Sequence, residues 1–259
     1  MLRALLAFIA FILMTMVLVA VLLTQRVLRL PGRGTISRTY SRMICALLGV
    51  RITVQGALSA DRAVLVVANH VSWLDILVIT ATAPTVFVAK REVASWPLVG
   101  IAARARGTVF VDRERRHKSE GTNAEIATQL AEGVAIVLFA EGTSSDGNRV
   151  LPFRSALLGA VQQAGVDGIR IQPLSIAYLR IHGLPMGRRH RPVAAWYGDM
   201  DLAPHLIDLM TRGPVDVTLT WGEVQASGPD ADRKALARTL ERTVRRMTID
   251  ALRGRTARA

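Results

Sequence analysis

From Arg51 onward, short apolar runs typical of β-strands alternate with longer stretches of helical periodicity. The strand-like runs are RITVQG, AVLVVA, TVFVAK, GTVFVD and VAIVLFAE, and helical stretches lie near residues 73–82, 92–105 and 119–132. This alternation predicts an α/β fold with a largely parallel central sheet flanked by helices. Ligands of such sheets usually collect beyond the carboxyl ends of the strands, so we look for chemistry at those ends.

The C-terminal part extends the same pattern. We expect a turn into a helix from LPFRSALLGAVQQAG and strands from IRIQPLSIAYL, PVAAWYG and PVDVTLTWGEV. From Asp230 a basic amphipathic helix follows, with Leu236, Leu240, Val244 and Met247 on one face. That helix either only packs on the sheet or also places its arginines against lipid phosphates.

The stretch from Ala4 to Thr24 contains no charged residue and is long enough to cross the hydrocarbon of a bilayer as a helix. A cleaved signal peptide is the alternative, but its apolar region is normally only about 7 to 15 residues. We therefore expect a retained anchor, either spanning the bilayer or lying in it. Arginines at 26, 29, 33 and 38 follow the run, which predicts that the chain after it lies on the cytoplasmic face of the inner (cytoplasmic) membrane.

Residues 35–50 predict a second helix. Its apolar side carries Ile36, Tyr40, Met43, Leu47 and Leu48. This helix either lies at the membrane interface or packs in the core, and an apolar stripe suits both. We accordingly divide the chain into a membrane anchor and turn over residues 1–34 and one domain over residues 35–259.

The composition limits the classes of partner. Fifty-one per cent hydrophobic residues in a chain of 259 exclude a disordered protein. A net charge of +13 calls for an anionic partner, either nucleic acid or anionic lipid. The apolar N-terminus favours lipid, and only 5% of the residues are aromatic, so we expect no nucleic acid. The single cysteine, Cys45, excludes an intramolecular disulfide, and we expect no metal site.

The segment AVLVVANHVSWLD brings three polar residues, Asn69, His70 and Asp75, to the end of an apolar strand. On an unbroken helix, a five-residue step rotates side chains by about 140°, so His70 and Asp75 meet only if the chain bends at Val71 and Ser72. If they meet, the carboxylate fixes the imidazole tautomer and leaves the other ring nitrogen free to accept a proton. Alternatively, these residues merely cap a strand-to-helix turn.

The loop EGTSSDG follows the apolar run VAIVLFA directly. Its glycines and small hydroxyl residues favour exposed backbone amides, which can hold an anion or a polar headgroup. A plain glycine-rich turn is the alternative. Glu141 argues against it, because a carboxylate at the end of a buried strand is costly unless it is hydrogen-bonded.

Taken together, these segments resemble the lysophospholipid acyltransferase family, which includes the 1-acylglycerol-3-phosphate acyltransferases. The resemblance covers roughly residues 35–222 in four blocks: Asn69, His70 and Asp75; Lys90, Glu92, Pro97, Gly100, Gly107 and Arg113; Phe139, Ala140, Glu141, Gly142, Thr143 and Ser144; and Gln172, Pro173 and Leu174. Each block alone is weak, whereas their shared order, spacing and strand context make coincidence a poor explanation. The resemblance implies a glycerolipid-acyltransferase-like fold.

It also implies roles for the site residues. His70 becomes the general base and Asp75 its orienting partner, while the acceptor site is lined by Lys90, Arg113, Glu141, Gly142 and Thr143. The substrates implied are a lysolipid and an acyl–acyl-carrier-protein or acyl-coenzyme A thioester, with no bound cofactor. The chemistry agrees, since acyl transfer to a hydroxyl needs a base and oxyanion donors. No Gly-x-Ser-x-Gly nucleophile elbow is present, so direct attack by the hydroxyl is favoured over an acyl-enzyme.

One position departs from the family pattern. Phosphatidic-acid-forming members carry an arginine, thought to meet the acceptor phosphate, where this chain has Ser144. Losing such a contact would remove about 1.5 to 3 kcal/mol. The loop looks like that of the bacterial branch that acylates lyso-ornithine lipid, although Arg149 or Arg154 could replace the arginine and keep lysophosphatidate open. A non-catalytic basic membrane or nucleic-acid-binding protein is the hypothesis from another class.

Overall fold

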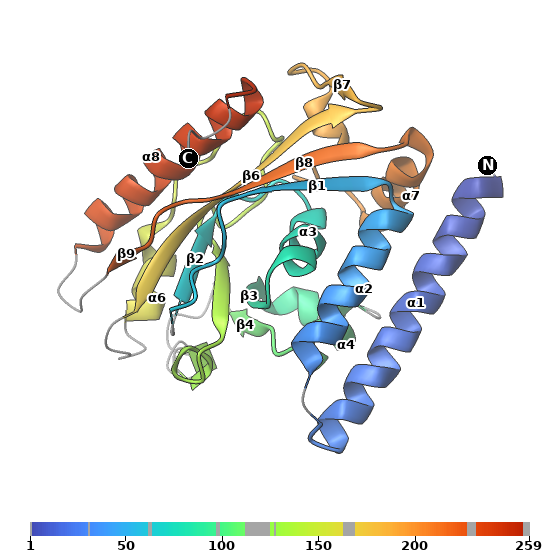
Figure 1. The fold of residues 1–259 in the computed structure, drawn as a ribbon, viewed down its shortest axis with the longest axis horizontal. Helices are drawn as coiled ribbons and strands as arrows, with labels where there is room; N and C mark the ends of the chain where they lie inside the picture. Colours follow the sequence, from blue (N-terminus) through green and yellow to red (C-terminus); the bar gives the residue numbers. More distant parts are fainter. Residues whose placement is uncertain are drawn as a thin grey trace.

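In this computed structural model the chain forms one mixed sheet with helices on both faces (Figure 1). The structure describes residues 2–30, 32–61, 64–96, 99–111, 125–126, 128–162, 169–226 and 232–255. The strands are β1 Val50–Gln55, β2 Val64–Ala68, β3 Thr85–Lys90, β4 Val109–Val111, β5 Ala135–Phe139, β6 Arg170–Ile181, β7 Leu184–Pro185, β8 Val215–Trp221 and β9 Gln225–Ala226. The helices are α1 Leu2–Val27, α2 Arg33–Leu47, α3 Leu74–Thr82, η1 Arg91–Ser95, α4 Val99–Ala105, α6 Ser155–Gln162, η3 Arg191–Val193, α7 Leu202–Arg212 and α8 Arg233–Leu252.

The sheet is largely parallel, as predicted. Its order is β1-β8-β6-β2-β5-β3-β4, with β7 and β9 paired to β6. Strands β6, β2, β5, β3 and β4 run parallel to one another, whereas β8 is antiparallel to β6 and β1 runs with β8. All five residues of β2 are buried, because it lies inside the sheet with helices on both faces. That position accounts for its continuous apolar sequence, which is rich in valine.

Each face of the sheet has its own apolar core. One core holds residues of α2, α3 and α7, including Ile44, Leu74 and Leu206. The other holds residues of α6 and α8, including Leu158 and Leu240. Helix α8 therefore lies on the side of the sheet opposite α1 and α2 (Figure 1). The predicted amphipathic helix is confirmed.

Helix α1 is long and apolar enough to cross a membrane by length and composition, over Leu5–Val27. It also packs against the rest of the protein. Leu18 and Leu22 are buried against Ala105 of α4, and the Thr15 and Tyr40 hydroxyls lie 2.7 Å apart. Its remaining surface exposes large apolar side chains, among them Leu5, Leu6, Ile9, Leu13, Met16 and Val17. One side of α1 is thus part of the protein interior, and the other has no protein partner among the described residues.

Helix α2 differs in part from the predicted amphipathic face. Its buried side carries Ser37, Ser41, Ile44 and Cys45, whereas the side chain of Met43 is 52% exposed. This side packs on α3, and the short serine side chains leave room for that helix. The core-packing alternative therefore describes the buried side of α2, while a lipid contact on its other side stays a prediction. So does the division of the chain at residue 34.

In the C-terminal half one prediction is wrong and one helix was missed. The segment PVAAWYG is not a strand: its start belongs to the 3₁₀ helix η3, and the backbone N–H of Trp196 bonds to the carbonyl of Val71. Ala194 and Ala195 are fully buried, so the apolar pattern reflects burial over the Val71 turn and not pairing in the sheet. The amphipathic helix α7 was not predicted. The helix predicted near 119–132 lies partly outside the described residues, although residues 128–131 are helical.

Candidate active site

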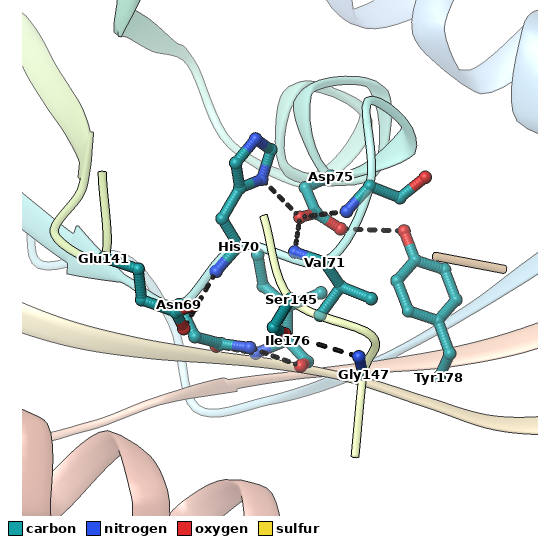
Figure 2. A network of polar contacts seen from close by, with 10 residues as sticks. Asn69, His70, Val71, Asp75, Glu141, Ser145, Gly147, Ile176 and Tyr178 are labelled. Carbon is teal, nitrogen blue, oxygen red and sulfur yellow. Dashed lines mark hydrogen bonds and ion pairs between the residues drawn. The ribbon is translucent and has the colours of Figure 1, made fainter. Parts of the chain in front are cut away.

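The turn between β2 and α3 brings His70 and Asp75 into contact. Strand β2 ends at Ala68 and α3 begins at Leu74, so the intervening residues form the bend that contact requires. His70 Nδ1 lies 2.8 Å from Asp75 Oδ2 (Figure 2). The geometric prediction for this pair is confirmed.

Four hydrogen bonds hold the Asp75 carboxylate in place. Oδ2 contacts His70 and accepts from the backbone N–H groups of Val71 at 2.7 Å and Ser72 at 3.0 Å. Oδ1 accepts from the Tyr178 hydroxyl at 2.8 Å (Figure 2). The side chain of Asp75 is completely buried. A carboxylate with both oxygens occupied in this way cannot rotate away from the imidazole without breaking several bonds.

Tyr178 is the residue that the sequence analysis missed. It lies on β6, on the same side as Leu174 and Ile176, and all three belong to the core that contains α3. Burial, and next the neighbouring Asp75 carboxylate, raise the pKa of the Tyr178 phenol well above its usual value, so it remains a proton donor. The alternation of side chains along β6 places Tyr178 in the core. Nothing in the sequence around Tyr178, however, indicates that it contacts Asp75.

The His70 ring packs flat against an aromatic side chain. Its centroid lies 4.0 Å from that of Phe139 with 15° between the planes, and Phe139 stacks in turn on Phe87 at 6.0 Å. The His70 side chain is 18% exposed. With Nδ1 directed at Asp75, the second ring nitrogen points away from the carboxylate (Figure 2). The imidazole is therefore held in one orientation with Nε2 left for chemistry.

The loop after β5 is hydrogen-bonded to the backbone of His70 on both sides. The N–H of His70 donates to Glu141 Oε1 at 3.3 Å (Figure 2). The N–H of Ser145 donates to the carbonyl of His70 at 2.9 Å. Gly142 between them has φ +73°, a left-handed conformation that glycine adopts without strain. The loop and β2 therefore position His70 together.

Glu141 faces inward. Its side chain is 2% exposed, and Oε2 is a buried atom without a hydrogen-bond partner among the described residues. Burial raises the pKa of this carboxyl to about 8, while the backbone bonds from His70 and Leu151 lower it. The predicted carboxylate is therefore bonded to backbone, as its position at the end of a buried strand required, and it is largely protonated at neutral pH.

The other predicted site residues fall into three groups. Lys90 is exposed at the carboxyl end of β3, on the sheet edge where β2 also ends, with β5 between the two strands. Thr143 is exposed and Gly142 buried in the loop beside His70. Arg113 lies outside the described residues. Hydrogen bonds thus link His70 to both Asp75 and Glu141, and Lys90 lies on the same edge of the sheet.

Asn69 has a supporting position. Its side chain is buried, donating to the carbonyl of Ile176 at 3.0 Å and accepting from the N–H of the same residue at 2.8 Å. These bonds tie the turn to β6.

The described residues include no cluster of three or more histidine, cysteine or acidic side chains suited to a metal ion. Burial raises the pKa of the Cys45 thiol to about 12, which makes it a poor nucleophile.

Comparison with known proteins identifies the family of this chain. The acyltransferase family model matches residues 50–177. The lyso-ornithine lipid O-acyltransferase of Rhizobium meliloti is 42% identical over 252 residues, covering 96% of this chain and 86% of that protein. The same enzyme of Brucella abortus is 47% identical over 220 residues, covering 83% and 82%. The 1-acyl-sn-glycerol-3-phosphate acyltransferase of Neisseria gonorrhoeae is 33% identical over 187 residues, covering 72% and 70%.

The fold agrees with a solved structure as well. The crystal structure of the 1-acyl-sn-glycerophosphate acyltransferase PlsC from Thermotoga maritima superposes with a TM-score of 0.68, covering 96% of each chain at 24% identity. At that identity the likeness concerns the fold. The matched family model and the extent of the bacterial relatives decide the classification: this chain belongs to the acyltransferase family and is an acyltransferase.

Proposed function

We propose that this chain transfers a fatty acyl group from a thioester to the hydroxyl of a lyso-ornithine lipid, with His70 as general base. The observation that carries the mechanism is the 2.8 Å contact between His70 Nδ1 and the buried Asp75 carboxylate. With Nδ1–H donated to Asp75, Nε2 carries the lone pair that accepts the hydroxyl proton.

The reaction then runs in two steps. As Nε2 of His70 takes the proton, the hydroxyl oxygen of the acceptor attacks the carbonyl carbon of the thioester and forms a tetrahedral oxyanion. The oxyanion collapses, the carbon–sulfur bond breaks, and the leaving thiolate takes the proton from His70. The products are the ester and the free thiol, and no covalent acyl-enzyme is needed. Asp75 stabilises the imidazolium in between.

We assign the remaining site residues to the acceptor side. Lys90, Arg113 and the loop of Gly142 and Thr143 contact the headgroup and the developing oxyanion. The exposure of Lys90 and Thr143 on the His70 edge of the sheet supports this assignment. Glu141 acts differently, because its carboxyl is buried against the backbone of His70. We assign it a positioning role.

Ser144 and the relatives support lyso-ornithine lipid as the acceptor. The proteins named for that substrate are 42% and 47% identical to this chain over most of its length, and a serine stands where phosphate-binding members carry arginine. Lysophosphatidate is the second candidate. It is favoured by the 33% identity to the neisserial enzyme and by Arg149 and Arg154, which are exposed shortly after the loop.

A side-by-side assay tests both acceptors. Purified wild-type protein is offered lyso-ornithine lipid and lysophosphatidate with either acyl carrier protein or coenzyme A as the acyl donor. We expect a higher kcat/KM on lyso-ornithine lipid, and a shift toward lysophosphatidate in the Ser144→Arg variant. His70→Ala, with its fold checked by thermal unfolding, should abolish turnover on both. A preference of the wild type for lysophosphatidate would sink the acceptor assignment, and turnover by His70→Ala would sink the mechanism.

We also place the domain over residues 35–259 at the cytoplasmic face of the inner membrane, anchored by α1. The exposed apolar side of α1 supports lipid contact. The basic residues at and just after its C-terminal end, Arg26 and Arg29, support the orientation. The native Cys45 is buried, so a cysteine introduced at exposed Arg253 reports on topology. An impermeant thiol reagent should label Arg253→Cys in inverted vesicles and spare it in intact spheroplasts; the reverse pattern would overturn the orientation.

A further inference from the structure

The outer surface of α8 carries a row of cations that the proposed reaction does not use. Lys234, Arg238, Arg242 and Arg246 recur every four residues and are all exposed. Residues four apart on a helix are neighbours, so this row places like charges side by side, which disfavours the helix. Within the described part of the chain, none of the four forms an ion pair. The row therefore weakens the isolated helix and suits an anionic partner.

The length of the row indicates a large partner. Twelve residues of helix separate its ends, which is about 18 Å. A single phosphate or nucleotide needs only one or two of these cations, whereas an acidic protein surface matches the whole row.

Position argues against lipid as that partner. Helix α8 packs on the face of the sheet opposite α1 (Figure 1). The exposed apolar residues of α1 are the part of the described chain suited to lipid. When α1 contacts the bilayer, the outer side of α8 faces water.

A groove lies between α8 and the loop that follows β5. It has a volume of about 480 Å³ and lies between the loop over residues 148–152 and Arg245, Thr248, Ile249 and Leu252 of α8. That loop begins a few residues after Thr143, and its exposed Arg149 extends the basic surface. Thr248 in turn bonds to Ser175 of β6 at 2.7 Å, next to the residue that holds Asn69. A partner on α8 thus lies beside the loop that continues from Thr143.

We propose that the basic row of α8 is the docking surface for an acidic acyl carrier protein, which delivers the acyl thioester from the water side while the lysolipid arrives from the membrane side. The inference rests on the proposed function, because it names the donor of that same reaction. It goes beyond that function by assigning the donor its own surface, away from the catalytic residues.

The experiment compares two donors on one charge-reversal variant. Full-length protein carrying Arg238→Glu, Arg242→Glu and Arg246→Glu is assayed with acyl carrier protein and coenzyme A thioesters of the same chain. We expect KM for the carrier-protein donor to rise about tenfold or more, since charge complementarity acts mainly on encounter. We expect kcat, and both constants for the coenzyme A donor, to stay unchanged. The matched control, with lysine at the same three positions, keeps the charge and should behave as wild type.

Direct binding separates this inference from the proposed function. Fluorescence anisotropy of labelled carrier protein requires no turnover, so weaker binding to the charge-reversed variant supports docking even if lyso-ornithine lipid proves not to be the acceptor. Should that variant fail to fold, the wild type still decides: carrier-protein binding that falls steeply with salt supports the inference, and salt-independent binding overturns it. An equal rise of KM for both donors in the charge-reversed variant would also overturn the inference. So would a charge-reversed variant that no longer binds anionic vesicles or RNA but still binds the carrier protein as the wild type does.

Discussion

Replacing Tyr178 with phenylalanine isolates one hydrogen bond of the site. The Tyr178 hydroxyl donates to Asp75 Oδ1 at 2.8 Å, and both side chains are buried. Phenylalanine keeps the ring and its packing in the core, so the variant creates almost no cavity. What it removes is the only hydrogen bond to Oδ1 among the described residues, leaving that oxygen without a donor in a site closed to water.

The magnitude follows from the charge of the acceptor. A hydrogen bond to a charged group contributes about 1.5 to 3 kcal/mol, and a buried group left unsatisfied costs a similar amount. We expect the free energy of unfolding to fall by about that much. If the whole of the bond energy serves to hold Asp75 against the developing imidazolium, kcat falls about 10- to 150-fold, because each 1.4 kcal/mol is about tenfold in rate. KM should not change, since Tyr178 is buried and is not one of the residues assigned to the acceptor.

The assay measures kcat, KM and thermal unfolding of Tyr178→Phe beside Tyr197→Phe, a matched control at a partly exposed position. The control should match wild type in all three. A double variant, Tyr178→Phe with Asp75→Asn, should lose less activity than the two single losses combined, because the residues act as a unit. Wild-type kcat in Tyr178→Phe would refute the reasoning, for it would show that Asp75 is fixed adequately without this bond.

Three further predictions concern other contacts. Asp75→Asn should keep the fold and lower kcat about 10³-fold or more, because an amide cannot stabilise the imidazolium; near-normal steady-state rates would contradict the assigned role. Burial raises the pKa of Glu141 in the folded protein to about 8 from its ordinary value of 4.5. The unfolded chain therefore loses this proton first, and wild-type stability falls as pH rises from about 5 to 8. The slope is at most about 1.4 kcal/mol per pH unit, and it should be absent in denaturant titrations of Glu141→Gln. Leu22→Ala, at a fully buried position of α1, should destabilise the detergent-solubilised protein by about 2 to 5 kcal/mol. Val17→Ala on the exposed side should not, and equal melting temperatures would mean that α1 is only a lipid anchor.

The sequence by itself determined the parts of this protein that local patterns encode. Continuous apolar runs mark strands covered on both faces, and their alternation with helical stretches predicts a largely parallel sheet. The bend at Val71 and Ser72 could be inferred because an unbroken helix would point the side chains of His70 and Asp75 in different directions. The burial of Glu141 against donors followed from its place at the end of a buried strand.

The tertiary structure alone decided which distant residues complete these local features. Tyr178 reaches Asp75 across 103 positions, because β6 pairs directly with β2 in the sheet, and no periodicity reports which strands are neighbours. PVAAWYG resembled a strand because burial over the Val71 turn produces the same apolar pattern as pairing does. The same limit applies to α1 and α8. Hydropathy cannot distinguish lipid from protein as the apolar partner of a helix, and only the packing showed that one side of α1 is interior and that α8 lies on the opposite face of the sheet.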